Sequence, residues 1–237
     1  MSRPRTGLRA SCSPGWSPAT PTARVIRISL DGGAFEYRAG QAASLALPGE
    51  SQQTPYSIAS APHETADHGA LEFLVKVDGS SRFGARVSDL LPGTDIAVTG
   101  PIGNFVFPAD VRGQPLLFIA GGTGIAPLRS MILDALDEDM SPAIALLYSA
   151  RTPDEFAYLD ELRLLQQEGR LSLSLTLTGQ GEDWEHARGR AGAAHLADLV
   201  NADTMCFICG PPSMVHEVPQ ALTSLGVARA RIRTEDW

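Results

Sequence analysis

The chain has 237 residues, of which 43% are hydrophobic and 19% are charged, and its formal net charge is −8. This composition is typical of a globular protein with one large domain or two of ordinary size. The acidic balance argues against a general nucleic-acid binder, and no apolar run reaches the length of a membrane-spanning helix. We therefore expect no nucleic-acid partner and no insertion into a membrane.

The cysteines also restrict the possible functions. Three cysteines are too few for a disulfide framework or a four-cysteine iron–sulfur cluster. Cys206 and Cys209 form a C-x-x-C pair, but Cys206 falls inside an expected buried strand and Cys209 at its end. This is a poor place for a metal knuckle. The sequence thus predicts reduced thiols, no metal site and a cytoplasmic location.

The N-terminal residues differ in composition from the rest of the chain. Residues 1–22 are rich in Pro, Ser and Arg, and no acidic residue precedes Asp31. They lack the apolar segment of a secretory signal. We expect residues 1–22 to form a disordered N-terminal extension, and docking to an acidic partner is the alternative role for this arginine-containing segment.

A β-rich domain is predicted for residues 23–110. Turn signals such as Asp31-Gly32-Gly33 and Pro92-Gly93 separate short apolar runs, and one short helix is expected at 83–90. The strands are expected at 24–30, 34–38, 43–47, 56–60, 70–77 and 95–99. Six short strands separated by turns indicate a small antiparallel barrel.

Residues 111–237 change to an alternating pattern of strands and helices, which predicts an α/β domain with a parallel sheet. Five strands are expected at 116–120, 143–149, 171–177, 204–209 and 228–235, and helices at 127–138, 154–168, 192–200 and 213–225. The first, second and fourth strands are apolar on both faces, whereas the third and fifth alternate and are therefore expected at the edges. This gives the strand order 3-2-1-4-5.

Two glycine turns follow the first and fourth of these strands. Gly121-Gly122-Thr123-Gly124 follows one, Cys209-Gly210-Pro211 follows the other, and each turn opens an expected helix. In open α/β sheets, ligands bind where the strand order reverses, which is between these two strands. Glycines let backbone N–H groups approach a pyrophosphate, and helix N-termini favour its charge. The sequence therefore predicts a dinucleotide site at this edge of the sheet.

The β-rich half adds three motifs, which are Pro55-Tyr56-Ser57, Gly79-Ser80-Ser81 and the segment Gly100–Phe105. Together with the two glycine turns, in this order, they resemble the ferredoxin–NADP reductase superfamily from about residue 22 onward. The resemblance implies a flavin-binding barrel followed by a nicotinamide-nucleotide domain, with no iron–sulfur domain fused to the chain. It implies FAD and either NADH or NADPH as cofactors.

The resemblance also assigns roles on the flavin side. Tyr56 would pack on the isoalloxazine ring, the Ser57 hydroxyl would reach flavin N5, and Ser81 would bind the flavin phosphate. The implied cofactor-binding residues here are Thr54, Pro55, Tyr56, Ser57, Val75, Lys76, Gly79, Ser80 and Ser81. A hydroxyl beside N5 orients the ring position that accepts hydride.

Three features depart from the family pattern. Thr54 stands where the family has an arginine that neutralises the flavin phosphate, a contact worth about 1.5–3 kcal/mol. Arg82 and Arg86 are alternative sources of that charge. The second motif is Gly-x-Ser instead of Gly-x-x-Ser. The segment before Arg24 does not read as a strand, which predicts a barrel that is open on that side.

On the nucleotide side, the resemblance implies contacts from the two glycine turns and their surroundings. These residues are Gly121, Gly122, Thr123, Gly124, Pro127, Arg151, Cys209, Gly210, Pro211 and Met214. The sequence ends Glu235-Asp236-Trp237, and Trp237 would stack on the flavin and step aside for nicotinamide. The implied catalytic set is Ser57, Cys209, Glu235 and Trp237.

These implications predict a flavin-dependent oxidoreductase that passes hydride from NAD(P)H to FAD and electrons to a protein such as ferredoxin or an oxygenase component. Thr178-Gly179-Gln180 offers no arginine at the end of the third strand, which favours NADH, although Arg151 is an alternative ligand for a 2′-phosphate. Two other functions stay open. One is reduction of free flavin or another small acceptor, and the other is a binding module that has lost flavin.

Overall fold

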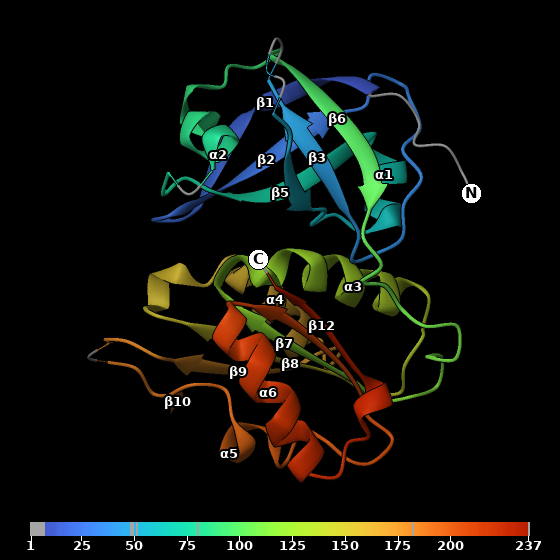
Figure 1. Cartoon of the computed structure of the whole chain (residues 1–237), viewed down its shortest axis with the longest axis vertical. Coiled ribbons are helices and arrows are strands. Elements are labelled where there is room, and N and C mark those ends of the chain that lie inside the picture. Colours follow the sequence, from blue (N-terminus) through green and yellow to red (C-terminus); the bar gives the residue numbers. More distant parts are fainter. Residues whose placement is uncertain (1–7, 48–49, 51, 80, 182, 237) are drawn as a thin grey trace. The chain divides into compact units, whose positions relative to one another are not determined.

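The computed structural model describes residues 8–47, 50, 52–79, 81–181 and 183–236. The chain divides into two compact units, Met1–Val106 with Arg129–Asp134, and Phe107–Leu128 with Ala135–Trp237. Figure 1 shows strands β1–β6 in the first unit and β7–β12 in the second. Helix α3 contributes its central residues to the first unit and its two ends to the second.

The first unit is a six-stranded antiparallel sheet with the order β4-β3-β6-β1-β2-β5. The strands are β1 Leu8–Thr20, β2 Ala23–Ser29, β3 Ala42–Ala46, β4 Thr54–Ser57, β5 Ala70–Lys76 and β6 Asp95–Ile102. An antiparallel bridge between Ile58 and Phe73 links the chain after β4 to β5, so the two edges of the sheet meet and form a barrel. Its core includes Ile26, Leu45 and Ile96, all almost fully buried.

Two short α-helices complete the first unit, α1 at Pro62–His68 and α2 at Arg82–Arg86, and a 3₁₀ turn η1 follows at Val87–Asp89. The Ser81 hydroxyl caps α2 by accepting a hydrogen bond from the N–H of Gly84 at 2.9 Å. Helix α1 was not expected from the sequence. The expected short helix at 83–90 is present as α2 and η1.

The first strand corrects the expectation of a disordered extension. Leu8–Thr20 forms β1, which pairs with β2 and β6, so the barrel is not open on this side. The strand contains two prolines, and because proline is disfavoured inside strands, the sequence did not predict a strand here. Pro14 falls where the register with β2 shifts, and Pro18 lies beyond the part of β1 that pairs with β6. Residues 1–7 of the expected extension lie outside the described residues.

The expected strand at 34–38 is also wrong, because this segment is not part of the sheet. Its apolar residues are held by side-chain contacts instead. The Tyr37 hydroxyl lies 2.8 Å from both the Ser60 carbonyl oxygen and the Thr65 hydroxyl. Burial raises the pKa of Tyr37 to about 12, so the phenol is neutral at physiological pH.

The second unit is a parallel sheet with the order β10-β9-β8-β7-β11-β12. The strands are β7 Leu116–Gly121, β8 Ile144–Ala150, β9 Ser172–Leu177, β10 Ala187–Arg188, β11 Met205–Gly210 and β12 Ile232–Asp236. The expected order 3-2-1-4-5 is confirmed by β9-β8-β7-β11-β12. The sheet has six strands instead of five, because the two-residue β10 adds to the β9 edge through the Gly189 N–H and the Leu177 carbonyl, 2.8 Å apart.

Helices connect these strands (Figure 1). They are η2 Gly122–Gly124, α3 Ile125–Asp137, η3 Pro153–Glu155, α4 Leu159–Gln167, α5 Ala193–Leu196, α6 Pro212–Ser224 and η4 Arg229–Arg231. The helix expected at 154–168 is divided, because Phe156 is extended and Tyr158 has a left-handed φ of 59°. Among the described residues, no helix is both long and apolar enough to cross a membrane.

Candidate functional site

The two glycine turns lie in direct contact at the carboxyl ends of β7 and β11. Ala120 and Cys209 pair in register, so both strands end at the same level of the sheet. A Cβ on Gly124 would lie 2.3 Å from the Cys209 carbonyl oxygen, and one on Gly121 would lie 2.7 Å from Pro211 Cδ. Only glycine permits this approach of one turn to the other.

The same turns place helix starts at this edge of the sheet. Gly122 has a φ of +55°, and a Cβ there would meet no atom within 4 Å. Two helical segments begin here, η2 running into α3 from Gly122 and α6 from Pro212, with Thr123 half-buried between the glycines and Pro127 in the first turn of α3. The first N–H groups of a helix have no intrahelical partner. Two such ends at a glycine-lined edge fit a pyrophosphate.

A buried tyrosine supports the first turn and was missed by sequence reasoning. The Tyr148 hydroxyl on β8 donates to the Gly122 carbonyl oxygen at 3.0 Å and accepts from the Ala157 N–H at 3.2 Å. Tyr148 is fully buried, which raises the pKa of its phenol. Tyr148 therefore stays neutral and fixes the turn. A tyrosine at the end of an otherwise aliphatic strand was the available signal.

The implied catalytic residues of the second unit lie on neighbouring strands. Glu235 on β12 pairs in register with Cys209 on β11. Cys209 and Cys206 are both fully buried, neither forms a disulfide with a described residue, and burial raises the pKa of the Cys206 thiol to about 12. In the described part of the chain, no group of three or more His, Cys, Asp or Glu residues could hold a metal ion. Trp237 lies outside the described residues.

On the flavin side, β4 carries the Thr54–Ser57 motif, with Tyr56 half-buried and Ser57 only 8% exposed. The Tyr56 ring packs against Phe83 with centroids 5.7 Å apart, and its hydroxyl is hydrogen-bonded to Ser81 Oγ at 2.5 Å. Burial raises the pKa of Tyr56 more than the Ser81 hydrogen bond lowers it. A neutral, partly exposed ring beside a serine hydroxyl fits the face of a flavin.

The start of α2 is packed tightly on the end of β5. A Cβ on Gly84 would lie 2.2 Å from the Lys76 carbonyl oxygen. This approach brings Lys76, whose side chain is exposed, to the same end of the barrel as Ser81. The Val75 side chain points into the barrel core, so only its backbone can contact a cofactor. Gly79 forms the intervening turn with a φ of +80°, and Ser80 lies outside the described residues.

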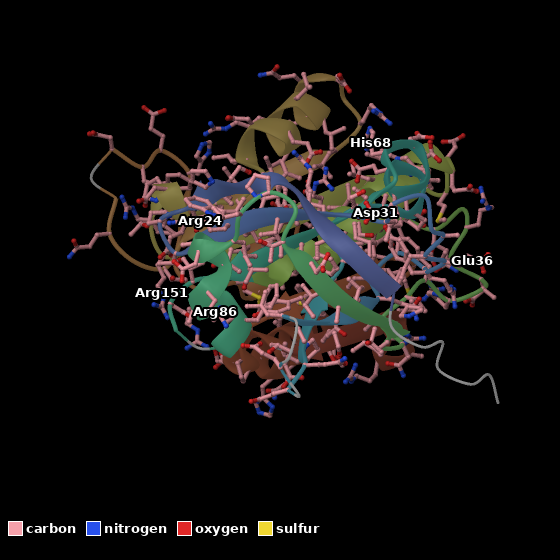
Figure 2. All side chains as sticks on the ribbon, turned by 90° about the horizontal axis from the view of Figure 1, so that it is seen from above. Arg24, Asp31, Glu36, His68, Arg86 and Arg151 are labelled. Atoms are coloured by element: carbon pink, nitrogen blue, oxygen red, sulfur yellow. The ribbon has the colours of Figure 1, made fainter. Side chains whose placement is uncertain are left out.

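Arg82 and Arg86 are the expected alternatives to a cation at Thr54, and the side chain of Arg82 lies outside the described part of the structure. Figure 2 labels Arg86 on α2, and its guanidinium forms an ion pair with Glu50 at 3.3 Å. Arg86 therefore offers only part of its charge to a flavin phosphate. An aromatic ring, two serine hydroxyls and a helix start are present here, and these groups fit FAD. Thr54 supplies no positive charge for its phosphate.

An exposed arginine and an aromatic pair lie at the ends of β8 and β9. Arg151, labelled in Figure 2, donates its backbone N–H to Glu155 at 3.2 Å, and a Cβ on Gly179 would lie 2.6 Å from the Arg151 carbonyl oxygen. Trp184 stacks on Phe156 with centroids 5.5 Å apart and an interplanar angle of 11°. Sequence reasoning missed this pair, because nothing in the spacing of the two residues indicates that they meet.

Comparisons with known proteins agree with this arrangement. Residues 20–107 match an oxidoreductase FAD-binding domain and residues 118–220 match an oxidoreductase NAD-binding domain. The chain is 32% identical over 234 residues to ferredoxin–NADP reductase B of Sorangium cellulosum, covering 93% of each chain. It is 30% identical to the reductase component of propane 2-monooxygenase of Mycolicibacterium smegmatis, covering 78% of this chain and 55% of that protein.

Solved structures show the same fold. The cytochrome P450 reductase GcoB of Amycolatopsis aligns with a TM-score of 0.85 at 24% identity, covering 97% of this chain and 69% of that one. A ferredoxin–NADP⁺ reductase of Neisseria gonorrhoeae with bound FAD and NADP aligns with a TM-score of 0.82 at 21% identity, covering 98% of each chain. The chain therefore belongs to the ferredoxin–NADP reductase superfamily and is an FAD-dependent NAD(P)H oxidoreductase.

Proposed function

We propose that the chain supplies reducing equivalents from NADH to an electron-carrier protein, such as a ferredoxin or the iron–sulfur component of an oxygenase. When bound, FAD accepts a hydride and releases electrons one at a time, which suits a one-electron protein acceptor. The names of the relatives support this class of acceptor, because they include a ferredoxin–NADP reductase and monooxygenase reductase components.

The observation that carries the proposal is the contact between the two glycine turns. Gly121 and Gly124 approach Pro211 and Cys209 too closely for any side chain. Their backbone donors would hold the NAD(P)H pyrophosphate, and the half-buried Thr123 would line the nicotinamide end, with the buried Cys209 behind it. Glycine turns and helix starts at one edge of the sheet suit a bound nucleotide, which supports an NAD(P)H-dependent enzyme over a binding module.

Each flavin-side residue has a distinct proposed role. Tyr56 would present its ring to the isoalloxazine, and Ser57 would offer a hydroxyl that orients the ring edge at N5. Ser81, which caps α2, would bind the flavin phosphate. Glu235 beside Cys209 and the neighbouring Trp237 would order the nicotinamide, as the family resemblance implies.

Steady-state turnover with defined acceptors tests the proposal. The protein supplied with FAD would be assayed with NADH and either a [2Fe–2S] ferredoxin coupled to cytochrome c or free FMN. We expect the kcat/KM for the ferredoxin to exceed that for FMN by at least about tenfold, because docking positions the donor and acceptor. Equal or higher values with FMN would contradict the proposal.

A second candidate, reduction of free flavin or another small acceptor, is favoured by two observations. The flavin-phosphate region has Thr54 in place of an arginine, and Arg86 is paired with Glu50. Both features would weaken the hold on FAD, and a flavin that dissociates readily acts as a substrate. A dissociation constant for FAD well above the protein concentration in the assay would favour this candidate.

NADH is the proposed donor because β9 ends in Thr178-Gly179-Gln180, without a cation for a 2′-phosphate. The Thr178 hydroxyl is hydrogen-bonded to the neighbouring strand β8, where it donates to the Ala150 carbonyl oxygen at 3.2 Å. A higher kcat/KM with NADPH than with NADH would overturn this preference and leave the reductase function intact.

A further inference from the structure

The middle of helix α3 is hydrogen-bonded to the backbone that follows β4. Arg129 Nη1 donates to the Ala59 carbonyl oxygen at 2.8 Å, and Ser130 Oγ donates to the Ser60 carbonyl oxygen at 2.7 Å. Both contacts lie within the first compact unit, to which residues 129–134 belong. The same helix begins directly after Gly122–Gly124. One helix therefore joins the nucleotide turn to the segment that continues the flavin-contacting strand.

The Arg129 guanidinium is held in place by two carboxylates. Its Nη1 and Nη2 donate to the two Glu64 oxygens at 2.9 and 3.0 Å, and a Glu72 oxygen lies 3.9 Å away. The Arg129 side chain is 8% exposed and that of Glu64 is 22% exposed. Glu64 also accepts the Ala61 N–H at 2.9 Å, so it is tied to the start of α1.

This pair fixes geometry more strictly than packing would. A bidentate guanidinium–carboxylate contact defines both distance and orientation, whereas apolar side chains of similar volume stabilise without defining either. Burying two charges also carries a desolvation penalty that apolar residues avoid. Glu72 does not complete a second pair of the same kind, because its other oxygen is bound by Arg27 Nε at 2.8 Å.

We propose that Arg129 and Glu64 are positioning residues for hydride transfer, which hold the helix that begins at the nucleotide turn to the backbone that follows Tyr56 and Ser57. The proposal rests on the reductase function proposed above. The atoms that form the pair are hydrogen-bonded to protein groups. Their removal should therefore slow the chemical step and leave the binding of FAD and NADH largely intact.

Stopped-flow reduction of the full chain, supplied with FAD, tests this role. The double variant R129M/E64M removes both charges together and avoids a buried unpaired ion. We expect its limiting rate of flavin reduction by NADH to fall by about tenfold or more, because small displacements of reacting groups carry large rate penalties. The apparent Kd for NADH and the amount of bound FAD should each change by less than about twofold.

Single substitutions and a control keep the test independent of folding. R129K keeps the charge but lacks the planar fork, so we expect a rate near that of the double variant. E64Q keeps one acceptor oxygen and should be intermediate. The exposed pair Arg112–Glu138, with nitrogen and oxygen 3.0 Å apart, provides the matched control R112M/E138M, which should match the wild type.

Three outcomes would count against the proposal. Wild-type rates in R129M/E64M and R129K would overturn it, and so would loss of FAD or NADH binding in parallel with the rate, because both would indicate a merely structural pair. A wild-type protein that neither NADH nor NADPH reduces would overturn the proposed function itself. The first two results leave that function standing, so the two failures are distinguishable.

Discussion

At the scale of single residues, the described side chains of the proposed flavin side offer hydroxyl groups at Tyr56, Ser57 and Ser81. Tyr56 and Ser81 are bonded to one another, and Ser81 caps α2 as well. Both groups are neutral, so neither compensates for a phosphate charge. Thr54, half-exposed on β4 opposite Leu45, is the position where a cation would change this most directly.

Replacing Thr54 with arginine should strengthen FAD binding. A new charge-assisted contact at a half-exposed position should lower the Kd for FAD by on the order of tenfold, measured by quenching of flavin fluorescence. T54K supplies the charge without the bidentate fork and should give a smaller gain. An unchanged Kd in T54R would mean that Thr54 does not face the phosphate.

Removing Arg151 should separate the two nicotinamide nucleotides. Arg151 is exposed at the end of β8, and we propose that it would meet the 2′-phosphate if NADPH were bound. We expect R151A to raise KM for NADPH by about tenfold and KM for NADH by less than about twofold, because only NADPH would lose an ion pair. Equal effects on both nucleotides would place Arg151 away from the ribose.

At the scale of elements, the turns between strands and helices decide what the sheet can bind. The turn after β7 and the turn after β11 are locked together by their glycines, and Tyr148 on β8 fixes the first turn from below. A change in one turn should therefore affect nucleotide binding even where no cofactor atom is touched.

The variant G124A tests this dependence. Its methyl group would lie 2.3 Å from the Cys209 carbonyl oxygen, a backbone atom that cannot move aside alone. We expect a loss of about 1–3 kcal/mol in the free energy of unfolding and a clear increase in the Kd for NADH. Gly192 has an extended backbone and only an ordinary contact for a Cβ, so G192A is the matched control. Wild-type NADH affinity in G124A would contradict the account.

Helix α1 should confer an acid-sensitive stability through Glu64. Burial alone would raise the pKa of Glu64, but the hydrogen bonds and charge of Arg129 outweigh burial and lower it below its ordinary 4.5. The stabilisation is therefore complete above the ordinary pKa and is lost as the pH falls through the lowered folded-state value. Urea unfolding should show wild type more stable than E64Q at neutral pH, with the difference shrinking in acid. A pH-independent difference would contradict this.

The sequence predicted the order of the parallel strands because strands buried on both faces are apolar throughout, whereas edge strands alternate between apolar and polar residues. β7 and β11 are buried along their whole length, whereas β9 and β12 are partly exposed. β1 could not be predicted, since its hydrogen bonds come from β2 and β6 and its prolines argue locally against a strand.

The glycine turns of the candidate site were recognisable, because close approach requires glycine at fixed positions. The supports of the site were not. Tyr148 and Arg129 reach partners far away in the sequence, Gly122 and Glu64, and no local pattern encodes such pairs. The same holds for the stack of Trp184 on Phe156. Such contacts are decided by tertiary packing.

At the scale of the whole molecule, the chain distributes its two cofactor sites over two compact units, and α3 belongs to both. The barrel unit carries Tyr56, Ser57 and the capped start of α2, and the sheet unit carries the two glycine turns with the starts of α3 and α6. The FAD-binding match covers residues 20–107 and the NAD-binding match covers residues 118–220. Assays of the function should therefore use the full chain.

The central claim is tested most directly by the visible spectrum of the purified protein, supplied with FAD and titrated anaerobically with NADH and then NADPH. The account predicts a bound-flavin spectrum that bleaches with NADH at about one equivalent and less readily with NADPH. A protein that retains no flavin, or a bound flavin that neither nucleotide bleaches, would contradict the claim that this chain is a working NAD(P)H reductase.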